Sequence, residues 1–195
     1  MPLAPMLLLF AAAVSAQTYE IRPAPDSRFA FEVFKTGLLG GKKHLFLFER
    51  YSGTLRHDAA APEKSSVDLT VDVASLVCKD TWIDEKDLKK VMAEAFAAHM
   101  LDPGKHPTIR FVSKSVARRA EGGFDVQGTL TIKGQDLPST VAVTLESRPD
   151  GTLRLAGKSE VRLKDYGLKP PSAALGAIGT KNEMAVDFSV TAWRK

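Results

Sequence analysis

The sequence contains a single cysteine, Cys78, and this excludes any disulfide bond within the chain. Stability must therefore come from a hydrophobic core, and 195 residues with 44% hydrophobic content are enough for one domain of ordinary size. Cys78 lies at the end of an apolar segment. We therefore interpret it as a packed thiol rather than as a redox or nucleophilic group.

An excess of charge of one sign is also missing. The chain has 27 Lys and Arg residues against 23 Asp and Glu residues, a formal net charge of +4, and the basic residues are scattered among the acidic ones. A nucleic-acid surface normally shows a denser basic stripe with interleaved aromatic side chains. The sequence therefore predicts no nucleic-acid partner.

Motifs that mark enzymes and metal sites are absent from the sequence. No Gly-x-Ser-x-Gly segment occurs, so a serine nucleophile cannot be proposed. The histidines show no i, i+4 pairing and no cysteine partner, which argues for surface or turn positions; they are His44, His57, His99 and His106. Asp84 with Glu85 fits a helix start, and Asp68 with Asp72 a solvated strand face, better than an acid and base pair. We predict a protein that is not an enzyme and holds no metal or cofactor.

A hydrophobic run long enough to cross a bilayer comfortably is missing as well. Residues 1–16 form a short, uncharged apolar segment that ends in Val14-Ser15-Ala16, a small-residue site of the kind that signal peptidase accepts. The residue directly after this site is Gln17 rather than a cysteine, so a lipoprotein anchor is not indicated. The sequence predicts a signal peptide over residues 1–16, a mature domain over residues 17–195, and a periplasmic or secreted location.

Alternation of apolar and polar residues dominates the rest of the chain. It is clearest in residues 66–73, and it is expected to continue to Cys78 with a bulge where the phase shifts. Residues 106–113 and 128–134 also alternate and are joined by a glycine-containing connection, which predicts a hairpin. Further strands are expected before residue 58, in a second hairpin over residues 138–163, and in residues 183–193.

One segment changes to a helical period. Apolar residues between Leu88 and Phe96 recur at helical spacing, Asp84 is a suitable N-cap, and Ile83 with Leu88 could form a hydrophobic staple. The sequence predicts one helix over residues 84–100.

These elements predict an all-β fold of about eight antiparallel strands, either a sandwich or a closed barrel. Gly53 within a strand favours the barrel, because curved sheets need such bends, and the helix would then lie near one barrel mouth.

The order of several short segments resembles the YceI family. The segments that carry the resemblance are Tyr19-Glu20-Ile21, Phe31-Glu32-Val33, Ser52-Gly53-Thr54-Leu55, residues 71–76, residues 106–113, residues 128–134 and Asp165-Tyr166-Gly167-Leu168. The resemblance implies a lipocalin-like antiparallel barrel with a long apolar tunnel, in an exported bacterial protein that binds isoprenoid-tailed lipids. The chain departs from the family where the longer helix precedes the strand with Phe111, and where Leu163 replaces an arginine common in many members.

The apolar faces of different strands supply the candidate ligand-binding residues. If the sheet closes, they surround one elongated apolar lumen; they are Phe31, Val33, Leu69, Val71, Phe111, Leu130, Ile132, Val186 and Phe188. The leading hypothesis is non-catalytic binding or carriage of an isoprenoid lipid or quinone-like molecule. A structural or partner-binding envelope protein with a filled lumen is the alternative, and an enzyme acting on an isoprenoid lipid is a weaker one. Transient membrane contact and a homodimer remain open.

Overall fold

The computed structural model describes residues 16–195, so the predicted signal peptide falls, except for Ala16, outside the described residues. Eleven strands and one α-helix follow in the order β1 (Gln17–Arg22), β2 (Arg28–Gly37), β3 (Lys43–Phe48), β4 (Tyr51–His57), β5 (Ser66–Asp72), β6 (Leu76–Cys78), α1 (Glu85–Ala95), β7 (Thr108–Arg118), β8 (Phe124–Ile132), β9 (Gln135–Ser147), β10 (Leu153–Arg162) and β11 (Ile178–Arg194). Short 3₁₀ turns lie between some of them. Among the described residues, no helix is both long enough and apolar enough to cross a membrane.

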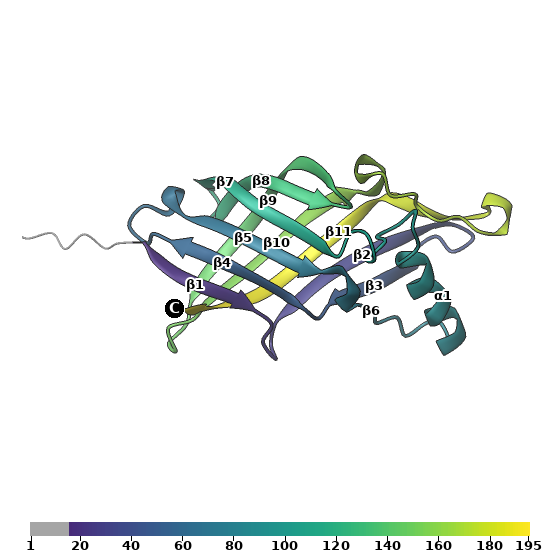
Figure 1. Ribbon diagram of the computed structural model, residues 1–195, viewed down its shortest axis with the longest axis horizontal. Helices are drawn as coiled ribbons and strands as arrows, with labels where there is room; N and C mark the ends of the chain where they lie inside the picture. The colour runs from purple at the N-terminus through teal and green to yellow at the C-terminus, as the bar shows by residue number, and fades with distance from the viewer. Residues whose placement is uncertain (1–15) are drawn as a thin grey trace, which may run out of the picture.

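Eight of the strands form a closed antiparallel barrel (Figure 1), in the order β1-β4-β5-β7-β8-β9-β10-β11. The barrel closes where β1 pairs with the end of β11, with Tyr19 opposite Arg194. This confirms the predicted fold class of an antiparallel barrel of about eight strands with one helix.

The sheet continues beyond one end of the barrel. β11 has 17 residues; its first part pairs with β2 and its last four residues pair with β1, while β10 runs along its other edge. β2, β3 and β6 therefore extend the sheet past the closed barrel, in the order β11-β2-β3-β6. Because one long strand serves both parts, the extension and the barrel share a continuous inner face.

The strand predicted over residues 66–78 is interrupted, so the expected bulge is wrong. β5 ends at Asp72, whose carboxylate accepts a hydrogen bond of 2.9 Å from the Ala74 N–H and caps a 3₁₀ turn. After this turn β6 pairs with β3, whereas β5 pairs with β4 and β7. The side-chain hydrogen bond competes with the strand ladder, as short acidic side chains often do. The phase shift in the sequence marks this change of partner.

The predicted helix is confirmed and is shorter than expected. Asp84 caps α1, because its Oδ1 accepts a hydrogen bond of 2.8 Å from the Asp87 N–H. The helix ends at Ala95, and residues 96–100 form turns rather than a further helical turn. Leu88, Val91 and Met92 pack against the core. Figure 1 shows α1 beside β3 and β6, at the end of the barrel that carries the sheet extension.

Candidate ligand-binding site

The barrel encloses an apolar cavity of about 150 Å³, here called the lumen cavity. All eight barrel strands contribute side chains to it, and so does β2. The polar members of its lining are His57 and four serines, Ser65, Ser66, Ser139 and Ser159. Because alternate residues of a strand face opposite sides of the sheet, each barrel strand turns its apolar set inward. The apolar side chains of all eight barrel strands therefore meet in this cavity.

A second cavity of about 230 Å³, here called the mouth cavity, lies between the sheet extension and α1. Its walls come from β2, β3, α1, the start of β11 and the segment after β10. Most of them are apolar, but polar side chains also reach it, and these are Lys35, His44, Lys90, Glu94 and Thr180. Leu163, which follows β10, is buried and lines this cavity. The mouth cavity thus has a mainly apolar wall, which includes Leu163, and a few polar side chains.

The nine predicted lining residues divide between the two cavities. Eight of them line the lumen cavity, and Val33 lines only the mouth cavity. Val33 lies opposite Met184 on β11, in the part of β2 that continues the sheet away from the closed barrel. The single elongated lumen expected from the sequence is therefore two cavities. Whether these residues contact a ligand remains a prediction.

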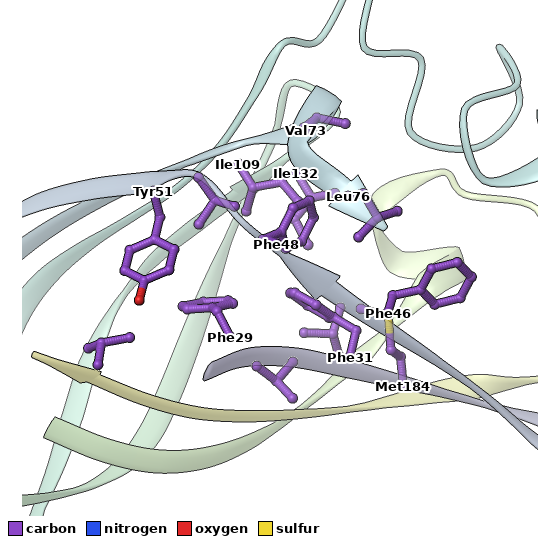
Figure 2. Close-up of a cluster of buried hydrophobic side chains, with 14 of the residues drawn as sticks. Phe29, Phe31, Phe46, Phe48, Tyr51, Val73, Leu76, Ile109, Ile132 and Met184 are labelled. Atoms are coloured by element: carbon purple, nitrogen blue, oxygen red, sulfur yellow. The ribbon is translucent and has the colours of Figure 1, made fainter. Parts of the chain in front are cut away.

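Phe31 stands at the boundary between the two cavities, since it lines both, together with Ile109 and Ile132. Figure 2 shows the Phe31 ring within a cluster of buried aromatic side chains. Its ring centroid lies 5.0 Å from that of Phe48 in an edge-on arrangement and 5.7 Å from that of Phe29. Such pairs stabilise the orientation of each ring. The boundary is consequently a packed aromatic wall.

Several lining residues were not among the predicted nine. Phe29, Val126 and Leu155 face the lumen cavity and follow the same alternation, so this signal could have found them. Met100 and Leu101 line the mouth cavity from the turn after α1. Their segment has no strand or helix period, and no pattern in the sequence places them there.

A buried polar network lies beside the mouth cavity and corrects one prediction, because His44 is not a surface residue. The side chain of Asp80 is 1% exposed; its Oδ2 lies 2.5 Å from His44 Nδ1 and its Oδ1 accepts a hydrogen bond of 2.8 Å from the Leu45 N–H. Trp82 stacks on the imidazole, with 5.3 Å between ring centroids. β3 and β6 bring these residues together, because the register that pairs Phe46 with Cys78 continues to His44 and Asp80.

Cys78 belongs to the same network. Its Sγ and donor atoms of His44 and Asp80 all lie within 4.8 Å of one another, and among the described residues this is the one group close enough to share a metal ion. Both oxygens of Asp80 already have partners, so the groups satisfy one another without an ion. Burial raises the pKa of the Cys78 thiol to about 11, which keeps it protonated at neutral pH. The prediction of a packed, unreactive thiol agrees with this geometry.

The chain matches the family model of the YceI-like domain over residues 19–192. The chain belongs to the YceI family. The match covers the barrel from β1 to β11, so the sequence-based resemblance to this family is confirmed.

Two Pseudomonas proteins are similar to this chain over most of their length. A UPF0312 protein of Pseudomonas syringae pv. syringae is 32% identical over 151 residues, which cover 75% of this chain and 74% of the relative. A UPF0312 protein of Pseudomonas putida strain W619 is 30% identical over 188 residues, which cover 94% and 90%.

Solved structures share the fold at lower identity. Burkholderia cenocepacia BcnA superposes with a TM-score of 0.66 at 21% identity, over 85% of this chain and 95% of that one. A polyisoprenoid binding domain from Saccharophagus degradans superposes with a TM-score of 0.53 at 15% identity, over 90% and 98%. At such identities the likeness shows a shared fold and nothing further.

Proposed function

We propose that this YceI-family protein binds and carries a long apolar molecule of the isoprenoid lipid or quinone type, without catalysis, in its two cavities. The observation that carries the proposal is the apolar lumen cavity, to which every strand of the closed barrel contributes. The structural likeness to a protein described as a polyisoprenoid binding domain supports the choice of ligand class.

The cavity volumes favour a long and narrow ligand. Each cavity is smaller than the roughly 300 Å³ at the lower end of typical ligand sites, so neither alone suits a bulky compact molecule. The two share three wall residues and lie end to end. A flexible chain that displaces the Phe31 ring would use both, with its tail in the lumen cavity and its polar end near Lys35 and His44.

Burial of apolar surface would provide most of the affinity. Each buried methylene contributes about 0.8 kcal/mol, from which the cost of ordering the chain must be subtracted. Affinity should therefore rise with tail length and level off once the cavities are filled, whereas the head group should matter less. A series of quinones with increasing isoprenoid tails, measured by quenching of protein fluorescence, tests this expectation.

A wall substitution checks that binding occurs in the lumen. Val71 is 2% exposed and faces the lumen cavity, so Val71→Trp should fill space there and abolish binding of long tails. Thr70→Trp is the matched control, since Thr70 is the adjacent residue of β5 and points to the other face of the sheet. A folded Val71→Trp variant that binds as the native protein does would show that the lumen is not the site.

Solvent extraction of the protein from its native compartment, followed by mass spectrometry, addresses the alternatives. A co-purified isoprenoid lipid supports carriage. If the protein holds no lipid and binds none of the quinone series, a structural role in the envelope becomes the better account. A bound lipid that is chemically altered over time would instead favour the enzyme hypothesis.

Export is part of the proposal. We expect residues 1–16 to be removed and the mature protein to begin at Gln17, the residue at which β1 starts. N-terminal sequencing of the protein from the periplasm or medium tests this, and a chain that retains Met1 would contradict it.

A further inference from the structure

The two large hydrophobic side chains that are exposed among the described residues lie in neighbouring loops. Leu38, in the turn between β2 and β3, is 78% exposed, and Leu175, in the turn before β11, is fully exposed. The Leu38 N–H donates a hydrogen bond of 3.0 Å to the Ala177 carbonyl oxygen, and Gly37 pairs with Ile178. Figure 1 shows both loops projecting from the end of the molecule that carries α1. This pair of loops is called the leucine tip.

The backbone that holds Leu175 outward is conformationally strained. Ala174 and Leu175 have φ angles of 51° and 54°, in the left-handed region that residues with a Cβ seldom adopt. Strained residues of this kind persist only where the surrounding structure fixes them, and they concentrate at functional positions. The turn is fixed by the bridge between Ala173 and Ile178. An exposed leucine on a strained turn is thus a feature that core packing does not explain.

The leucine tip is also uniformly basic. Residues 35–43 and 169–182 contain five lysines and no Asp or Glu; the lysines are Lys35, Lys42, Lys43, Lys169 and Lys181. Lys43 is paired with Glu32, whereas the other four form no ion pair with any described residue. The Nζ atom of Lys42 lies 5.6 Å from the Trp82 ring centroid, and that of Lys181 lies 5.7 Å from the Phe34 ring centroid. Exposed leucines among lysines and aromatic rings are the composition of interfacial membrane-binding surfaces.

The leucine tip adjoins the mouth cavity. The cavity wall includes Pro171, in the segment before β11, and also Lys35 of β2 and Thr180 of β11, which are close in sequence to the two loops. We propose that the leucine tip docks on the surface of an anionic phospholipid bilayer, with Leu38 and Leu175 inserted among the acyl chains and the lysines at the headgroups. The role of this docking rests on the proposed function. Docking would bring the mouth cavity to the membrane from which an isoprenoid lipid is taken.

Sedimentation with vesicles tests the docking without any isoprenoid ligand. The purified protein should bind vesicles of phosphatidylglycerol and phosphatidylethanolamine, and binding should weaken as salt is added or as phosphatidylcholine replaces the anionic lipid. Each lysine near such a surface contributes roughly fivefold to partitioning, so the double variant Lys42→Gln/Lys181→Gln should bind roughly 25-fold more weakly. Leu175→Asn should weaken binding about tenfold, since it removes an inserted side chain.

Lys64→Gln is the matched control. Lys64 is exposed in the turn between β4 and β5, at the opposite end of the barrel, and its loss should leave vesicle binding within twofold. Equal binding by the native protein and by both tip variants would overturn the proposal. So would a concentration-dependent dimer in sedimentation velocity that Leu175→Asn abolishes, because the leucine tip would then be a contact between two copies.

The two proposals fail separately. Vesicle binding that depends on the leucine tip, in a protein that binds no quinone, supports docking and refutes carriage. If the protein binds quinones but does not bind anionic vesicles, the docking proposal is refuted and the carriage proposal still stands.

Discussion

Replacing Phe31 by alanine should both destabilise the barrel and join its two cavities. The Phe31 side chain is 7% exposed and its ring packs against Phe29 and Phe48, so its removal leaves a cavity that the rigid strands cannot fill. A loss of about 3–5 kcal/mol in the free energy of unfolding is expected for a buried Phe→Ala change. At 2–4 °C per kcal/mol for a domain of this size, Tm should fall by roughly 10 °C.

The same change should alter the selection for tail length. With the aromatic wall removed, a longer tail fits, and each further methylene adds about 0.8 kcal/mol, or nearly fourfold in Kd. The tail length at which affinity levels off should therefore increase, as measured with the quinone series. Phe46→Ala is the matched control: Phe46 is 8% exposed and lines only the mouth cavity, so its loss should destabilise the protein without joining the cavities. If both variants shift the plateau equally, or if Phe31→Ala costs less than 1 kcal/mol, the reasoning is refuted.

Two further predictions concern the core network and the helix. Because burial raises the pKa of Cys78 from 9.0 to about 11, the unfolded chain ionises its thiol first, so stability should fall as the pH rises from 9 to 11. Urea titrations across this range should show a slope that Cys78→Ser reduces, while burial of Tyr51 and Tyr166, which raises the pKa of each phenol, keeps part of it; an unchanged slope would contradict the assignment. Asp84→Ala should cost about 1 kcal/mol by removing the cap of α1, while Asp84→Asn, which can still accept the hydrogen bond, should cost little in the same titrations.

Strand positions and inward faces could be predicted from the sequence because they depend on local alternation. Val71 and Ile132, for example, were assigned to the apolar inner face from their period alone, and both are 2% exposed. The pairing of the strands was harder to predict, because an antiparallel strand shows the same alternation whichever strand lies beside it. The phase shift after Asp72 marks the break between β5 and β6, but the period does not show that β6 then pairs with β3.

The apolar character of the site could be predicted from the sequence, but the division of the lumen into two cavities could not. Apolar faces indicated a lumen, whereas the wall at Phe31 depends on how three rings pack across different strands. His44 was misjudged for a similar reason. Its partner Asp80 is 36 residues away, and only the pairing of β3 with β6 brings their side chains together.

The pairing of β1 with the end of β11 places the first and last strands of the barrel side by side. Gln17 starts β1, and the Lys195 N–H donates a hydrogen bond of 3.0 Å to the Thr18 carbonyl oxygen, at the barrel end remote from α1 (Figure 1). An affinity tag at the C-terminus would therefore leave the leucine tip free, and a sensor chip loaded through that tag would present the mouth cavity to a passing lipid suspension. A short linker from Lys195 to Gln17 would also allow circular permutation, with new termini cut in the turn between β9 and β10.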